Sequence, residues 1–347
     1  MTEFTRRRFI QGTGLALAAS AIPGSRAFAK EGRITVASYG GIFETAMRKT
    51  FVAYFEKKTG IKADIHLGNP SLWVSQVQAS RNKPPIDVVL SDGTVLLSAA
   101  PGGAFEKVSV EKIPNMADVP AFFNDLAKGW GSAFDYGTAG IVYHKGRVKN
   151  PPKSIKEFVD RTIKGEWRVS LSNAAYHPGL GNVIWSINDA LGGTVSNITP
   201  VIEAVKRMKP HCVFWSSVTQ FLQHLSSGEA DIGIYHDGRT WAYYDAGNHW
   251  IDFINPKEGA VANPIYTAKP RGASEHAWTF MDVMLEPEPQ AQFAEIMNYA
   301  MTNRKTKYPD RIKNRFAPLD AVRLLPVGEM GKHVPMWIER WNKEIGA

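Results

Sequence analysis

The chain has 347 residues, of which 44% are apolar and 21% are charged, as is ordinary for a globular protein. Its net charge of +8 is partly due to the N-terminal arginines, and the other basic residues are scattered without a long lysine/arginine run, which argues against nucleic-acid binding. The single cysteine, Cys212, excludes an intrachain disulfide, an iron–sulfur cluster and a zinc ribbon. A chain of this length is expected to form two domains.

The first 29 residues have the layout of an export signal. Arginines at positions 6–8 precede a short apolar run over residues 12–22, and small residues at Ala27 and Ala29 fit a peptidase site. The run is much shorter than the roughly 20 residues that span a bilayer, and the arginine pair resembles a twin-arginine signal. We expect cleavage after Ala29 and a mature chain that begins at Lys30 outside the cytoplasmic membrane. The alternatives are an uncleaved anchor or a chance basic N-terminus.

The mature chain begins with alternating strands and helices. Residues 34–37 predict a strand, and the apolar spacing from Ile42 to Phe55 predicts a helix that ends at Gly60. Further along, residues 61–67 predict a strand, 71–80 a helix and 86–90 a short buried strand. This order predicts a parallel sheet with helices on both faces.

The remaining elements continue the α/β pattern. Strands are expected over residues 140–143, 168–171 and 231–235, and helices over 202–208, 218–225, 289–301 and 334–344.

Several segments in this order resemble the periplasmic solute-binding proteins of ATP-driven importers, and most closely the spermidine/putrescine-binding group. They are ITVASYGGIFETAMRKTFVAYFEKKTGIKADI, PPIDVVLSDG, SSGEADIGIYHDGRTWAYYDAG, EPEPQAQFAEIMNYAMTNRKT and the closing WIERWNKEIG. Together they span the mature chain.

The resemblance implies a two-lobed periplasmic-binding-protein fold of type II, in which each lobe is a mixed, mostly parallel sheet flanked by helices. We expect lobe 1 to comprise residues 30–136 and 269–347, and lobe 2 residues 137–268. The chain would cross between the lobes near residues 134–137 and 263–266. The resemblance also implies a monomer without cofactor or enzymatic activity, which closes on a small organic ligand and docks on an inner-membrane permease with its cytoplasmic ATPase.

The first candidate site follows the opening strand, at Tyr39, Gly40 and Gly41. Ligands of open parallel sheets bind beyond the carboxyl ends of the strands. The next helix lacks a capping side chain, so its amides could bind an anionic group. The alternative is a structural turn whose amides meet water.

Other candidates share this position at a strand end or at a crossover. Asp92 and Asp237 could instead only cap helices, Arg239 could pair with Asp237 on the surface, the segment with Asn173 could be an exposed turn, and the crossover tyrosines could be hinge packing. The candidates are Ser91, Asp92, Tyr136, Asn173, Tyr176, His177, His236, Asp237, Arg239 and Tyr266.

The ligand is expected to be a small anionic or zwitterionic organic molecule. No acidic residue occurs over residues 169–188 or 259–274, where polyamine binders would need carboxylates. Asp92 or Asp237 would hold an amine, and Arg239 or the Gly40–Gly41 amides an acid. Polyamine binding is the alternative.

Two further alternatives concern iron and catalysis. Tyr243–Tyr244 resembles the tyrosine pair of ferric-ion binders but lies about two helical turns too far from the strand end, so we expect helix packing. No GxSxG, HExxH or Walker motif is present, although a catalytic pair such as His236 and Asp237 stays open.

Overall fold

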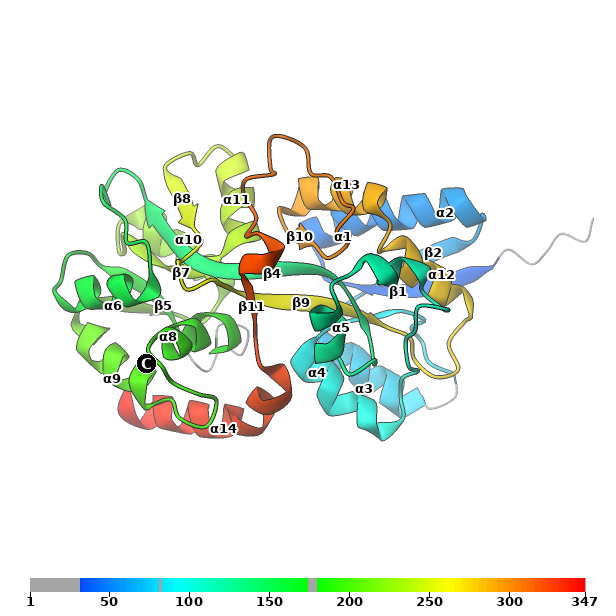
Figure 1. The fold of residues 1–347 in the computed structure, drawn as a ribbon, viewed down its shortest axis with the longest axis horizontal. Helices are drawn as coiled ribbons and strands as arrows, with labels where there is room; N and C mark the ends of the chain where they lie inside the picture. Colours follow the sequence, from blue (N-terminus) through cyan, green and yellow to red (C-terminus); the bar gives the residue numbers. More distant parts are fainter. Residues whose placement is uncertain (1–31, 81–82, 174–179, 347) are drawn as a thin grey trace, which may run out of the picture.

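The computed structural model describes residues 32–80, 83–173 and 180–346. Two long strands, β4 (Ser132–His144) and β9 (Ala260–Ala268), run through the middle of the molecule and connect its two ends (Figure 1). They pair in antiparallel fashion from Ser132, opposite Thr267, to Ala139, opposite Val261. The other elements gather around the ends of this ribbon and form two lobes.

The strands form one large mixed sheet and one small parallel sheet. In the large sheet the order is β11–β9–β4–β7–β5–β6, with β3 on β9 and with β8 and β10 on β4, while β1 and β2 pair separately. The remaining strands are β1 (Arg33–Ser38), β2 (Lys62–Leu67), β3 (Val89–Asp92), β5 (Val169–Ser172), β6 (Cys212–Trp215), β7 (Ile232–His236), β8 (Ile251–Ile254), β10 (Ala300–Met301) and β11 (Val322–Leu324).

The predicted two-lobed α/β class is confirmed, with more antiparallel pairing than expected. The pairs β1–β2, β5–β6, β5–β7 and β9–β11 are parallel. Every pair of β4, including the central ribbon with β9, and the pair β3–β9 are antiparallel.

The first helix runs without a break from residue 42 to 59, as the apolar spacing predicts, although its middle turn is π-helical. It ends at Gly60, whose φ of 74° suits a glycine cap. The helical segments before β4 are α1 (Ile42–Met47), η1 (Arg48–Val52), α2 (Ala53–Thr59), α3 (Pro70–Ser80), α4 (Gly93–Ala99), η2 (Ala100–Gly102), η3 (Pro114–Asp118) and α5 (Ala121–Leu126).

The later helical segments are α6 (Ile155–Ile163), η4 (Leu180–Ile184), α8 (Trp185–Ala190), α9 (Thr199–Met208), η5 (Lys209–His211), α10 (Val218–Ser227), α11 (Asp237–Asp245), α12 (His276–Val283), α13 (Pro287–Met297), η6 (Leu319–Ala321) and α14 (Val327–Glu344). The helices from α6 to α11 lie around the second lobe, α12 and α13 belong to the first lobe, and α14 lies again on the second (Figure 1). Among the described helices, none has the length and apolar character that a membrane span requires.

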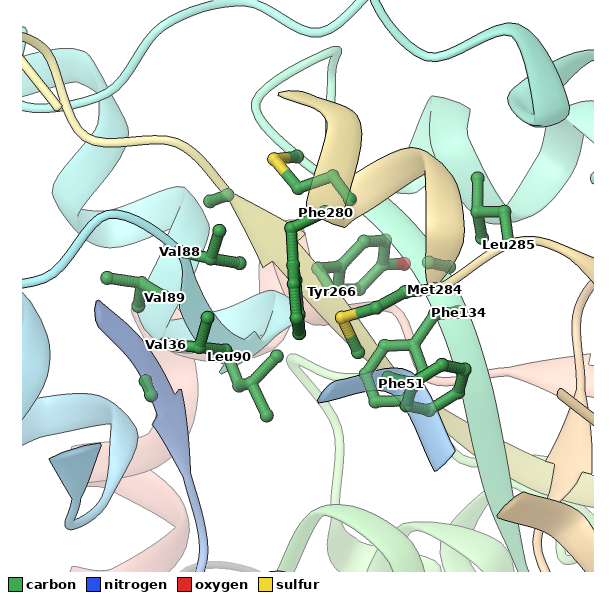
Figure 2. Close-up of a cluster of buried hydrophobic side chains, with 14 of the residues drawn as sticks. Val36, Phe51, Val88, Val89, Leu90, Phe134, Tyr266, Phe280, Met284 and Leu285 are labelled. Atoms are coloured by element: carbon green, nitrogen blue, oxygen red, sulfur yellow. The ribbon is translucent and has the colours of Figure 1, made fainter. Parts of the chain in front are cut away.

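Each lobe has its own hydrophobic core. The first core brings together side chains of β1, β3, the first helix, α12 and α13, and Figure 2 shows part of it around Val36, Leu90 and Phe134. The rings of Phe51 and Phe134 meet edge to face at 5.9 Å. The second core gathers β5, β7, α9 and α14. Removal of this apolar surface from water is the main force that holds each lobe together.

The chain passes from one core to the other along the central strands. On β4, Tyr136 is buried in the first core and Ala139 in the second, and on β9 the change occurs between Val261 and Ala262. The segments 134–137 and 263–266, expected as crossovers, therefore lie next to each other in the ribbon. A third passage, absent from the sequence prediction, occurs after Leu324.

Helix α14 packs differently from the expectation that residues 269–347 all belong to lobe 1. It buries Met330, Trp337 and Trp341 in the second core, because these residues share one face of the helix. The indole nitrogen of Trp337 also donates to the carbonyl of Val195 at 2.8 Å. The other expected lobe boundaries stay predictions.

Candidate ligand-binding site

A cavity of about 370 Å³ lies between the lobes, within the size range of small-molecule sites. Its walls come from both lobes and from the central strands. The lining residues are Tyr39, Asn69, Pro70, Asp92, Thr94, Gly137, Gly181, Asn182, His236, Asp237, Arg239, Asn263, Ile265, Tyr299, Leu325, Met330 and Val334.

Asp92 enters the cavity at the junction of β3 and α4. Its Oδ1 accepts hydrogen bonds from the amides of Thr94, at 2.9 Å, and Val95, at 3.0 Å. Oδ2 has no hydrogen-bond partner among the described residues. Asp92 therefore caps α4 and lines the cavity at once, so that the two interpretations of the sequence do not exclude each other.

Asp237 lies at the start of α11 and is fully buried. Its Oδ2 accepts from the hydroxyl of Thr138 at 2.7 Å, and its Oδ1 from the amide of Gly238 at 2.6 Å. Burial outweighs these hydrogen bonds and raises the pKa of Asp237 to about 7. Nearby, burial also raises the pKa of Asp135 well above its ordinary value. Asp237 therefore brings less negative charge to the cavity at neutral pH than an ordinary aspartate would.

The raised pKa of Asp237 predicts a pH-dependent stability. Between the unfolded pKa near 3.8 and the folded pKa of about 7, the folded state binds more protons, so the free energy of unfolding falls as pH rises. Asp237→Asn, which imitates the neutral acid, should remove on the order of 2 kcal/mol of this dependence. Urea unfolding at pH 5 and pH 8 measures it, with the exposed Asp160→Asn as control. Equal pH dependence in wild type and Asp237→Asn would contradict the prediction.

His236 and Arg239 give the cavity one neutral and one cationic side chain. Burial, and then the charge of Arg239, lower the pKa of His236 to about 3, so the imidazole is uncharged at neutral pH. Arg239 is exposed and forms no ion pair with any carboxylate of the described residues. Its guanidinium is thus available to an anionic group in the cavity.

Two tyrosines supply the aromatic part of the lining. The ring of Tyr39 packs edge to face against Phe43 at 5.0 Å and Trp73 at 5.3 Å. Burial raises the pKa of Tyr39 well above its ordinary value, and electrostatic repulsion from Asp92, Asp135 and Tyr299 adds to this effect. The hydroxyl therefore keeps its proton. The ring of Tyr299 lies directly against Gly238, where a β-carbon would overlap it.

Five of the residues predicted from strand ends line the cavity in the structure. They are Tyr39, Asp92, His236, Asp237 and Arg239. Gly40 and Gly41 are instead exposed and outside its lining. Gly41 has φ 72°, which only glycine adopts easily, so the pair forms a turn.

The remaining candidates lie away from the cavity or outside the described residues. Ser91 is buried, and its hydroxyl donates to the Asp92 carbonyl at 2.9 Å. Tyr136 and Tyr266 are buried in the first core, where their hydroxyls donate to Ala317 and Phe123 carbonyls, which fits the hinge-packing alternative. Asn173 is absent from the lining, and its backbone N–H donates to the carbonyl of Trp215. Tyr176 and His177 are outside the described residues.

Sequence reasoning missed several lining residues. Asn263 lies within a predicted crossover, so its position was a usable signal. Asn182, Tyr299, Met330 and Val334 follow no strand end, and only tertiary packing brings them to the cavity.

The tyrosine pair of the iron alternative does not line the cavity. Tyr243 packs against Trp250, with ring centroids 5.7 Å apart, and Tyr244 against His249 at 4.6 Å. Among the described residues, no three histidine, cysteine, aspartate or glutamate side chains are grouped to hold a metal ion. These contacts agree with the prediction of helix packing.

Comparison with known proteins identifies the family. The sequence profile of the bacterial extracellular solute-binding proteins matches residues 83–324, and the chain belongs to this family. A crystal structure from Bordetella parapertussis, assigned as an extracellular solute-binding protein, is 31% identical, with a TM-score of 0.84 over 91% of this chain and 99% of that chain.

Curated relatives show a range of named ligands. A thiamine-binding periplasmic protein of Escherichia coli is 36% identical over 105 residues, and the match covers only 28% of this chain and 29% of that relative. A γ-aminobutyric acid-binding protein of Pseudomonas aeruginosa is 22% identical over 84% of this chain and 82% of its own length.

Proposed function

We propose that the protein is the solute-binding component of an ABC importer and that its ligand is a small zwitterion with an amine at one end and a carboxylate at the other. The observation that carries this proposal concerns the part of the chain that the structure describes. In one interlobe cavity, buried acceptor oxygens have no hydrogen-bond donor there, and an arginine has no carboxylate partner there.

The acceptors favour the amine end. Asn182 Oδ1 and Asn263 Oδ1 are both buried and have no hydrogen-bond partner among residues 32–80, 83–173 and 180–346, and both residues line the cavity. A buried polar atom left unpaired costs about 1–3 kcal/mol. An ammonium group has three donors and could satisfy these oxygens together with Asp92 Oδ2.

Arg239 favours the acid end. A guanidinium can bind a carboxylate through two parallel hydrogen bonds, and no carboxylate of the described residues occupies this one. A polyamine would instead place a second ammonium in a cavity that contains this cation. The charge pattern therefore favours a zwitterion over the polyamine alternative.

The remaining parts of the proposal follow from family membership and the N-terminal sequence. The protein would be exported through its twin-arginine-type signal, cleaved after Ala29, and would act in the periplasm as a monomer. The closed, loaded form would dock on the inner-membrane permease and its ATPase. The proposed role is transport without chemical change of the ligand, rather than catalysis.

A matched series of four-carbon ligands tests the ligand class. By calorimetry on the mature protein, γ-aminobutyrate should bind at least about tenfold more tightly than butyrate, which lacks the amine, and than putrescine, which lacks the acid. Butyrate leaves the acceptor oxygens of the cavity without a donor, and putrescine leaves Arg239 without a carboxylate. Tighter binding of putrescine, or equal binding of butyrate, would overturn the proposal.

A further inference from the structure

A charged cluster whose residues do not line the cavity connects the lobes. We name it the Asp245 cluster, and it comprises Asp245, Asn298, Arg311 and Arg315. Asp245, at the end of α11, accepts two hydrogen bonds from Arg315, at 2.7 and 2.8 Å, and one from Arg311 at 3.0 Å. Asn298 donates to it at 3.3 Å. The Arg315 side chain is only 11% exposed, so solvent weakens this ion pair less than it weakens an ordinary surface pair.

The bonds to Asp245 join elements of different lobes. Helix α11 packs through Trp241, Tyr243 and Tyr244 on the second core. The three partners lie among residues of the first core, including Met297, Ala300, Ile312 and Phe316. The Arg315 guanidinium also lies over the Trp241 ring, 4.9 Å from its centroid. The cluster therefore holds the lobes against each other.

The cluster is connected to the cavity lining through two segments of the chain. Helix α11 carries Asp237 and Arg239 at its beginning and Asp245 at its end. On the other side, Asn298 directly precedes Tyr299, whose ring contacts Gly238 and lines the cavity.

Asn298 ends α13 in the left-handed backbone conformation. Its φ is 55°, which few residues other than glycine adopt. Arg315 donates to its Oδ1 at 2.7 Å, while its Nδ2 donates to Asp245. These bonds fix the turn that places Tyr299 at the cavity.

We propose that Asp245, Asn298 and Arg315 are positioning residues for ligand binding: they hold the lobes together and fix Tyr299, so that ligand affinity depends on them although none lines the cavity. The link to affinity rests on the proposed function. A ligand that contacts both lobes and a cluster that bridges them favour the same closed arrangement of the lobes. Loss of the cluster must therefore lower the affinity for the ligand.

The first experiment needs no ligand. Spin labels are placed on cysteines at the exposed Lys57 of the first lobe and Lys156 of the second, in a Cys212→Ser background. Asp245→Asn should broaden the distance distribution and shift it to longer distances. The matched control is Asp310→Asn, because Asp310 pairs with Lys313 at 2.8 Å within the first lobe and forms no ion pair with a described residue of the second lobe. An unchanged distribution in Asp245→Asn would refute the proposal.

The second experiment measures affinity for γ-aminobutyrate. Asp245→Asn and Arg315→Gln should each weaken it about tenfold, and the double variant should be little worse than either, because paired residues are not additive. Asp310→Asn should bind like wild type. Additive losses, or unchanged affinity, would count against a positioning role. If wild type itself did not bind γ-aminobutyrate, the ligand class would fail, while the distance measurement would still decide on the cluster.

Discussion

Arg239→Gln is expected to weaken γ-aminobutyrate binding by about 10- to 100-fold, with little change in thermal stability. The substitution removes the cavity cation that a carboxylate would bind, and charge-assisted hydrogen bonds of this kind are about twice as strong as neutral ones. The side chain is exposed and forms no ion pair with a carboxylate of the described residues, so the fold loses almost nothing. Calorimetry and thermal unfolding measure the two effects.

A second ligand and a second arginine make this test specific. Butylamine has no acid, so its binding should be equal or tighter in Arg239→Gln. Arg207→Gln changes an exposed arginine of the same lobe, on α9, and should leave γ-aminobutyrate affinity unchanged. Equal losses for both ligands would show that Arg239 does not contact the acid.

Trp337→Ala is expected to lower the free energy of unfolding by about 3–5 kcal/mol, as large-to-small core substitutions do. The side chain is 1% exposed and packs near Trp185, with ring centroids 6.0 Å apart. Its loss also leaves the Val195 carbonyl without its indole donor. Urea unfolding monitored by circular dichroism measures the change.

Trp337→Phe separates packing from the hydrogen bond. Phenylalanine keeps most of the ring contact and removes the donor, so a smaller loss of about 1–2 kcal/mol is expected. If Trp337→Ala cost less than about 1 kcal/mol, α14 would not be an anchor of the second core.

Local patterns predicted the amphipathic elements well. The helix from Ile42 and the strand β2 have periodic apolar positions, whereas β1 and β7 are short runs in which most residues are buried. The long strand β4 was predicted only over residues 140–143. Its earlier part contains Asp135 and Gly137, which disfavour strands locally, and it is extended because it pairs with β9, more than 120 residues later.

Of the residues that line the cavity, those that the sequence predicted lie at or shortly after the ends of strands. Asp92 and His236 were found because they end strands of the sheet. Tyr299 reaches the cavity from a turn after α13, and Met330 from a helix whose lobe the sequence did not reveal. Such positions depend on contacts between distant segments, which local periodicity does not encode.

The central ribbon has a consequence for how the molecule comes apart. Among the described strands, β3 of the first lobe forms a continuous ladder with β9 alone, from Val89 opposite Ala268 to Asp92 opposite Ile265. β9 also contributes Val261 to the second core. Unfolding of either lobe would therefore remove hydrogen-bond partners from the other lobe. We expect heating to give one cooperative unfolding transition. A fragment that ends before β9 would expose unpaired strand edges and should aggregate rather than fold.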